Sequence, residues 1–291
     1  MIRRVGIVAK PGLTAAASLL SDIARWLQAR GVEPVFESAT AEMAGAAGYR
    51  QVSRDDLPRH VELVLVLGGD GTMLGMADRV AQAGLEIPIL GVNFGGLGFL
   101  TEITLPELFP SLEAALAEQA AVETRLMLQA TVERGGALLA NRPVLNDVVV
   151  TGGELSRIIE FSVTVGDEFV ARFNADGIII ATPTGSTAYN LSAGGPIVHP
   201  AVDAFVLNPI APHTLTNRPV VIPASTIVMV QPHVLRPEGD AFVTFDGQDN
   251  VKLLDGDLIR VQRAPRPAHL VRASTRGYYQ VLREKLKWSE R

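Results

Sequence analysis

Residues Val61–Thr72 read VELVLVLGGDGT, an aliphatic run that ends in two glycines, an aspartate, a third glycine and a threonine. Valine and leucine occupy both faces of the run and only Glu62 interrupts them, which is typical of a parallel strand buried between two layers. The residues from Thr72 to Ala83 then recur with helical spacing and stop near Gly84. A buried strand, a glycine-rich turn and a helix form the repeating unit of open α/β sheets, so this stretch decides the fold of the N-terminal part.

The segments on both sides of this stretch also alternate between strand-like and helix-like patterns. The predicted strands are Val5–Ala9, Val32–Phe36 and Ile87–Val92, and the predicted helices are Leu19–Leu27 and Leu105–Gln119. Pro34 lacks an amide hydrogen, so it should confine its strand to an edge of the sheet. Residues 40–59 carry the weakest pattern and are expected to form a loop. The alternation predicts an α/β domain with a Rossmann-like parallel sheet over residues 1–120.

From about Val122 the pattern changes to short strands separated by glycine, proline and asparagine. The predicted strands are Met127–Val132, Val144–Thr151, Ile158–Val165, Gly177–Ala181, Val220–Ile222, Thr226–Gln231, Ala241–Phe245 and Leu258–Gln262. Few segments with helical spacing of apolar residues lie between them, which favours an all-β, sandwich-like domain over residues 121–270. The last segment, residues 271–291, contains a predicted helix at Tyr278–Trp288, which we expect to pack back on the N-terminal domain.

The composition restricts the classes of function. The net charge of −5 gives no basic surplus, which argues against a protein that binds duplex nucleic acid. No stretch approaches the roughly 20 apolar residues of a membrane span, and Lys10-Pro11-Gly12 ends the first apolar run too early for a signal peptide. Cysteine is absent, which suits a reducing compartment. We therefore expect a soluble, cytoplasmic protein that binds neither nucleic acid nor membranes.

The glycine-aspartate turn, Gly68-Gly69-Asp70-Gly71-Thr72, follows a parallel strand at the edge where open α/β sheets bind ligands. Glycines let the backbone approach phosphate oxygens, and the first amide groups of the following helix attract an anion. A carboxylate there can take a proton from a hydroxyl nucleophile, or help to hold Mg²⁺ against the phosphates. Alternatively, Asp70 and Thr72 only cap the helix. The chain has no Gly-x4-Gly-Lys-Ser/Thr sequence and is therefore not a P-loop NTPase.

Two further stretches combine glycine with polar residues. Gly91–Leu100 follows the next predicted strand, and it forms either a tightly packed loop or a second wall of the same pocket. Thr182–Pro196 reads TPTGSTAYNLSAGGP, with several hydroxyl groups and no charge. Such a run suits the recognition of sugar and amide groups, although it could also be a surface loop. Asn146-Asp147 and Asp176 lie among apolar residues, where they either end strands or point into a pocket.

Together these elements resemble the bacterial NAD kinase family over essentially the whole chain. The resemblance rests on Gly68–Thr72, Gly91–Asn93, Leu97–Leu100, Asn146-Asp147, Asp176-Gly177, Thr182–Pro196 and Asp246–Gln248. The glycine-aspartate motif alone is shared with phosphofructokinases and with diacylglycerol and sphingosine kinases. The long polar run is much more specific to NAD kinases.

The resemblance implies transfer of the γ-phosphoryl group of ATP to the 2′-hydroxyl of the adenosine ribose of NAD, giving NADP. It implies that Asp70 is the general base and that Gly68, Gly69, Gly71 and Thr72 form the phosphate-binding turn. The residues implied to bind NAD are Asp70, Gly71, Asn146, Asp147, Arg157, Asn174, Asp176, Thr187, Ala188, Tyr189, Asn190, Leu191, Ser192 and Gln248. Parts of this site would come from a neighbouring subunit of a homodimer or homotetramer.

The resemblance further implies a divalent cation, Mg²⁺ by expectation, that accompanies ATP and is not held by protein side chains alone. ATP is the default phosphoryl donor, and polyphosphate is a possible alternative. Two other functions remain open from the residues themselves. One is a lipid or sugar kinase built on the same turn, and the other is a non-catalytic nucleotide sensor in which Asp70 only caps its helix.

Overall fold

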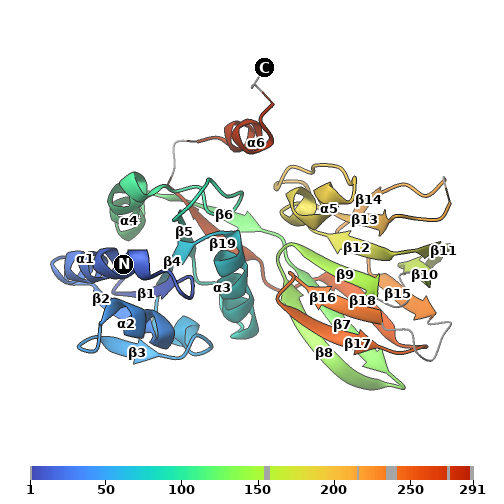
Figure 1. Cartoon of the computed structure of the whole chain (residues 1–291), viewed down its shortest axis with the longest axis horizontal. Helices are drawn as coiled ribbons and strands as arrows, with labels where there is room; N and C mark the ends of the chain where they lie inside the picture. Colours follow the sequence, from blue (N-terminus) through green and yellow to red (C-terminus); the bar gives the residue numbers. More distant parts are fainter. Residues whose placement is uncertain (1, 154–157, 215, 234–240, 274–275, 289–291) are drawn as a thin grey trace. The chain divides into compact units, whose positions relative to one another are not determined.

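The structure is a computed structural model that describes residues 2–153, 158–214, 216–233, 241–273 and 276–288. The chain divides into two compact units (Figure 1). The N-terminal unit comprises Met1–Thr124 and Ala268–Arg291, and the C-terminal unit comprises Arg125–Pro267. The expected boundaries were after residues 120 and 270. The observed division differs because strands β6 (Ala121–Arg125) and β19 (Ala268–Arg272) both belong to the N-terminal sheet.

The N-terminal sheet has the strand order β3-β2-β1-β4-β5-β19-β6 in the described part of the chain. The bounds of the remaining strands are β1 Arg4–Ala9, β2 Glu33–Glu37, β3 Arg50–Val52, β4 Leu63–Gly68 and β5 Ile89–Asn93. The ladders that join β3, β2, β1, β4, β5 and β19 are parallel. All of β4 is buried, because Leu63, Leu65 and Leu67 pack into one core while Val64 and Val66 point to the other face. The predicted parallel sheet is therefore confirmed.

The N-terminal unit also contains helices, several of which pack against this sheet. Their bounds are α1 Ala17–Gln28, α2 Ser38–Ala44, α3 Asp70–Gln82, α4 Leu108–Leu116 and α6 Tyr278–Leu286, with 3-10 turns η1 Thr14–Ala16, η2 Leu57–His60 and η3 Leu105–Glu107. Helix α1 turns Leu20, Ile23 and Leu27 into the same core as Leu63 and Leu65, in keeping with their helical spacing. Within the described residues, no helix is both long and apolar enough to cross a membrane.

Two expectations about the first 60 residues are wrong. Strand β2, which contains Pro34, lies between β1 and β3 rather than at the edge. The ladder to β3 begins at Val35, so the missing amide hydrogen of Pro34 falls outside it. Residues 40–59 are not a loop, because they hold most of α2, all of β3 and most of η2. The Glu37 carboxylate caps α2 by accepting from the Thr40 amide at 2.9 Å, and Gly45, at φ +61°, ends it.

The C-terminal unit is an antiparallel sandwich of two sheets, which confirms the predicted architecture. Among the described residues their strand orders are β11-β10-β15-β18-β7-β8 and β14-β13-β12-β9-β16-β17. The strand bounds are β7 Leu128–Arg134, β8 Ala137–Val144, β9 Asp147–Gly152, β10 Ile159–Val165, β11 Glu168–Ala175, β12 Gly177–Ala181, β13 Ala204–Ile210, β14 Val220–Pro223, β15 Val228–His233, β16 Ala241–Phe245, β17 Asp249–Leu253 and β18 Leu258–Arg263. Alternate residues of both sheets, such as Phe161 and Phe205, form one apolar core.

One predicted strand of this unit is divided. The run Val144–Thr151 was expected to be continuous, but β8 ends at Val144 and β9 begins at Asp147. The backbone amides of Leu145 and Asn146 bond to the Asp246 carboxylate instead of to a neighbouring strand. A long-range side chain therefore breaks the strand.

The C-terminal segment returns to the N-terminal unit, as predicted. Arg276 Nη1 donates to Glu107 Oε2 at 2.9 Å and to the Glu102 carbonyl at 3.1 Å. Burial alone would raise the pKa of Glu107, but hydrogen bonds from Arg276 and Thr104 lower it to about 2. On α6, Lys285 Nζ lies 5.7 Å from the centroid of the Phe99 ring.

Candidate active site

The glycine-aspartate turn lies where β4 ends and α3 begins. Gly69 is the N-cap of α3 and Asp70 is its first residue. The first amide groups of a helix have no partner within the helix, so those at the start of α3 can bind an anion. Gly68 pairs in register with Asn93 of β5. Any Cβ at position 68 would lie 2.7 Å from Thr72 Oγ1, so close packing of Thr72 over the turn requires glycine.

Asp70 bonds across the turn to the loop after β5. Its Oδ2 accepts from the Phe99 amide at 2.8 Å. Its Oδ1 accepts from the amides of Leu100 at 3.1 Å and Thr101 at 3.0 Å, and from Thr101 Oγ1 at 2.9 Å. Within the described residues, no side-chain cap bond is formed at the N-cap of α3. The capping alternative therefore does not describe what Asp70 does in this structure.

The two carboxylate oxygens of Asp70 accept different numbers of hydrogen bonds. A carboxylate offers about four lone-pair positions, two on each oxygen. Among the described residues, three donors meet at Oδ1 and one at Oδ2. Asn93 Nδ2 donates to Thr101 Oγ1 at 3.0 Å, so the Thr101 hydroxyl directs its own proton to Asp70. Oδ2 is consequently the oxygen with capacity for a further hydrogen bond.

Of the stretch Gly91–Leu100, residues 91–93 belong to β5, and the loop that follows is folded tightly against this carboxylate. Asn93 Oδ1 accepts from the Gly95 amide at 2.6 Å, and the Gly98 amide donates to the Thr101 carbonyl at 3.1 Å. A Cβ at Gly98 would lie less than 3.0 Å from both Asp70 Oδ1 and Thr101 Oγ1. No role for Thr101 was expected from the sequence, in which its place directly after a glycine-rich stretch was the available signal.

In the C-terminal unit, three predicted segments converge at one end of a sheet. Ala181 at the end of β12 pairs with Asp147 at the start of β9, and Phe245 at the end of β16 pairs with Val148. Asn146 and Asp147, the Thr182–Pro196 run and the Asp246–Gln248 turn therefore lie at the same end. Gln248 is exposed, and its amide donates to the Phe245 carbonyl at 2.9 Å.

The Thr182–Pro196 run is not a loose surface loop, because its buried hydroxyl and amide groups bond to its own backbone and to neighbouring segments. Thr182 Oγ1 donates to the Leu145 carbonyl at 2.6 Å. Ser186 Oγ accepts from the Val198 amide at 2.9 Å. Asn190 is fully buried, and its Nδ2 donates to the Ser186 carbonyl at 3.0 Å. The side chain of Asn190 therefore supports the run from within. Thr187, Ala188 and Leu191 are half-buried, and Tyr189 and Ser192 are exposed.

Asn146 has a buried oxygen without a hydrogen-bond partner among the described residues, whereas Asp147 has a buried carboxyl group with a raised pKa. Asn146 Oδ1 is buried and has no hydrogen-bond partner among the described residues. A buried acceptor without a partner costs about 1–3 kcal/mol, which a ligand donor would recover. Asp147 is 5% exposed. Burial, together with the charge of Asp246, raises the pKa of Asp147 to about 7, although a hydrogen bond from the Tyr189 amide opposes the rise.

Other predicted residues lie away from this cluster. Asp176 directly precedes β12, while Asp147 pairs with the last residue of that strand, so the two are roughly 15 Å apart along it. Asn174 is exposed on β11, and its carbonyl accepts from the His213 amide at 3.0 Å. Arg157 lies outside the described residues. Asn174 and Asp176 therefore lie at the opposite end of β12 from Asp147.

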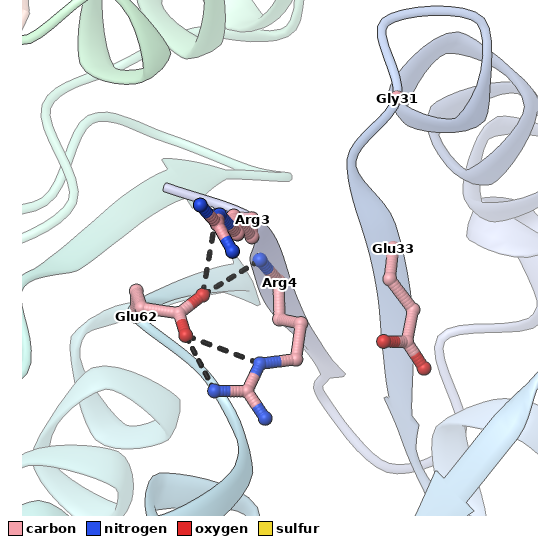
Figure 2. A pocket seen from close by; sticks show the side chains of 5 residues that line it. All are labelled: Arg3, Arg4, Gly31, Glu33 and Glu62. Carbon is pink, nitrogen blue, oxygen red and sulfur yellow. Dashed lines mark hydrogen bonds and ion pairs between the residues drawn. The ribbon is translucent and has the colours of Figure 1, made fainter. Parts of the chain in front are cut away.

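A separate hollow of about 730 Å³ (Figure 2) lies where strands β1, β2 and β4 begin. The glycine-aspartate turn follows the other end of β4. It is lined by Arg3, Arg4, Gly31, Glu33 and Glu62. Arg4 Nη2 donates to Glu62 Oε1 at 2.5 Å, and the Arg4 amide donates to Glu62 Oε2 at 2.7 Å. Because the central guanidinium and carboxylate bond each other, we assign this hollow no part in the chemistry.

Comparison with known proteins identifies one family for both units. The N-terminal domain of ATP-NAD kinases matches residues 5–120, and the C-terminal domain of ATP-NAD kinases matches residues 145–273. The NAD kinase of Geotalea daltonii is 44% identical over 290 residues, with 100% of both chains covered. The NAD kinase of Geobacter metallireducens is 43% identical over 290 residues, again with 100% of both chains covered.

Solved structures agree with these relatives. An NAD kinase from Archaeoglobus fulgidus, in complex with ATP, is 26% identical and has a TM-score of 0.76, covering 97% of this chain and 98% of that chain. A yeast NADH kinase complexed with NADH is 24% identical and shares the fold with a TM-score of 0.89, covering 100% and 89%. Matches to both domains and to full-length relatives show that the chain belongs to the ATP-NAD kinase family.

Proposed function

We propose that this protein is an NAD kinase, which transfers the γ-phosphoryl group of ATP to the 2′-hydroxyl of the adenosine ribose of NAD and forms NADP. The observation that carries this proposal is the 44% identity to an NAD kinase over the full length of both chains. Both domains match ATP-NAD kinases, which favours NAD over a lipid or a sugar as the acceptor, and an enzyme over a nucleotide sensor.

Asp70 is the general base in the proposed mechanism. Its Oδ2 takes the proton from the ribose hydroxyl, the ribose oxygen bonds to the γ-phosphorus, and the bond from that phosphorus to ADP breaks. Phosphoryl transfer depends mainly on positioning and on stabilisation of charge. The four donors on Asp70 supply the positioning, since they fix the direction in which Oδ2 points. The turn Gly68–Thr72 and the first amides of α3 bind phosphate oxygens.

Mg²⁺ enters with ATP in this proposal. Mg²⁺ binds phosphate oxygens readily and keeps several of its water ligands, so it needs few ligands from the protein. When bound, it would neutralise negative charge on the phosphates of ATP. The carboxylate of the turn itself belongs to Asp70, and its remaining hydrogen-bonding capacity at Oδ2 is assigned to the ribose hydroxyl. No side chain of this chain is therefore assigned to the metal.

The C-terminal unit recognises NAD in this proposal. Asn146 Oδ1 accepts a hydrogen bond from the dinucleotide, which supplies the partner that this buried atom lacks among the described residues. Other residues at the same end of the sheet complete this part of the site, namely Asp147, Thr187, Ala188, Tyr189, Ser192 and Gln248. Asn174 and Asp176 lie at the other end of β12, so we assign them to a site completed by a neighbouring subunit of a homo-oligomer.

Subunit sharing predicts complementation between two inactive variants. Asn146→Ala and Asp176→Ala are each expected to weaken NAD turnover strongly on their own. In randomly mixed dimers, half of the dimers contain one chain of each variant. In such a dimer both substitutions fall in one shared site and the other site is intact. About a quarter of the wild-type activity should therefore return. Co-expression of the two variants followed by an NADP assay measures this. Activity no higher than the mean of the two separate variants would show that each site lies within one chain.

The function itself is tested by the choice of acceptor. Purified protein with ATP and Mg²⁺ is offered NAD, a diacylglycerol or a hexose phosphate in parallel reactions, and ADP release is measured. We expect ADP release with NAD that is well above that with the other two acceptors. Turnover of the lipid or the sugar without NAD turnover would establish a different kinase.

A further inference from the structure

Asp246 follows β16 and has an unusual backbone conformation. Its φ is +51°, in the left-handed region, and the next residue, Gly247, has φ +63°. Aspartate tolerates this region better than most residues with a side chain, but it is still uncommon there. The conformation turns the Asp246 carboxylate back toward the connection between β8 and β9.

The Asp246 carboxylate accepts hydrogen bonds from three successive backbone amides. Oδ2 accepts from the Leu145 amide at 2.8 Å, and Oδ1 accepts from the amides of Asn146 at 2.7 Å and Asp147 at 3.1 Å. The Asp246 amide in turn donates to the Asp147 carbonyl at 3.0 Å. Hydrogen bonds to an ionised acceptor are stronger than neutral ones, so this arrangement holds the segment firmly.

Thr182 fixes the same segment from its carbonyl side. Thr182 Oγ1 donates to the Leu145 carbonyl at 2.6 Å, and the Thr182 amide donates to the Asn146 carbonyl at 2.8 Å. Amides and carbonyls of Leu145 and Asn146 are therefore all engaged. Because the backbone is fixed on both sides, the directions of the Asn146 and Asp147 side chains depend on the Asp246 carboxylate.

Asp246 also acts on Asp147 through its charge. Burial is the largest cause of the raised pKa of Asp147, and the negative charge of Asp246 is the next. The other segments packed around Asp147 add little charge: β12 has no ionisable side chain, and the Thr182–Pro196 run contributes the Tyr189 amide. A cation, Arg125, reaches this run at Thr184, with Nη1 3.4 Å from Thr184 Oγ1.

We propose that Asp246 is a positioning residue for NAD binding, which orients Asn146 and Asp147 through its bonds to their amides and sets the protonation of Asp147 through its charge. This inference rests on the proposed role of Asn146 and Asp147 in binding NAD. A neutral carboxyl both donates and accepts hydrogen bonds, whereas an ionised one only accepts, so the protonation of Asp147 changes which ribose contacts it can make.

Asp246→Asn tests both parts of the proposal. The amide group cannot accept all three backbone bonds, so KM for NAD should rise about tenfold or more, as expected for the loss of a charge-assisted hydrogen bond. The kcat value should change much less, because the site of phosphoryl transfer is unaltered. The pH profile of kcat/KM for NAD reports groups in the free enzyme. Its midpoint should move to lower pH in the variant, because the like charge beside Asp147 is gone.

Two further variants, one at Asp249 at the start of β17 and one at Asp246 itself, serve as controls. Asp249→Asn removes an exposed carboxylate three residues further on, one that lies 3.6 Å from Arg142 Nε, and it should behave like wild type in KM and in the pH profile. Asp246→Glu keeps the charge but changes its reach, so it should raise KM while leaving the midpoint near its wild-type pH. Melting temperatures of all three variants identify any that fails to fold.

The outcomes separate this inference from the proposed function. If wild type forms no NADP, the proposed function fails. If wild type is active and Asp246→Asn matches Asp249→Asn in KM and midpoint, Asp246 has no positioning role. If Asp246→Asn is folded but loses kcat with an unchanged KM and midpoint, the role assigned here is also overturned.

Discussion

Replacing Asp70 by asparagine is expected to lower turnover by about 10²–10⁴-fold, the usual contribution of a general base, while much of the NAD affinity remains. Asparagine has nearly the same shape as aspartate but cannot take the hydroxyl proton. Its amide oxygen can keep the donors that now meet at Oδ1, while its NH₂ group would face the Phe99 amide, which is also a donor. The chemical step should therefore suffer much more than the binding of NAD.

The measurement is kcat for NADP formation, together with NAD binding by calorimetry. Thr101→Val is the matched control, because it removes one donor to Oδ1 but leaves the carboxylate intact. It should lose less than about tenfold in kcat, since one hydrogen bond is worth about 1 kcal/mol. Wild-type turnover in a purified Asp70→Asn variant would contradict the assignment of Asp70 as the base.

Gly98→Ala is expected to lower kcat by about 10²-fold, the loss that a shift of roughly 1 Å in a catalytic group can produce. The added Cβ would lie less than 3.0 Å from Asp70 Oδ1 and Thr101 Oγ1. To avoid this overlap the loop has to withdraw, and it carries the Phe99, Leu100 and Thr101 amides away from the carboxylate. Asp70 would keep its charge but lose its fixed direction.

Gly96→Ala, in the same loop, separates this effect from a general loss of loop flexibility. Nothing lies within 4 Å of a Cβ at position 96, and the φ of Gly96 is not in the left-handed region. Its kcat should stay close to wild type. Equal losses in the two alanine variants would show that the contact with Asp70 is not what requires glycine at position 98.

The strand, turn and helix around Asp70 could be predicted because their signals are local. Apolar residues on both faces mark β4, and helical spacing marks α3. The same rules failed for α2, since Ser38–Ala44 contains few large apolar residues and takes its cap from Glu37. Short elements that are stabilised by one side chain leave only a weak periodic pattern.

The fine structure of the candidate site depends on contacts between distant residues, which local patterns do not carry. The donors to Asp70 lie 29 to 31 residues further along the chain. The carboxylate that interrupts the predicted strand at Leu145 comes from Asp246, 101 residues away. The polar run was singled out by its composition, but composition could not show that Asn190 supports it from within.

The most direct test of the central claim is the position of the phosphate on the product. After incubation of wild type with ATP, Mg²⁺ and NAD, the dinucleotide product is purified and its phosphorus is correlated with ribose protons by NMR. The proposed mechanism predicts coupling of the new phosphate to H2′ of the adenosine ribose. A phosphate on another hydroxyl, or no phosphorylated dinucleotide at all, would contradict it.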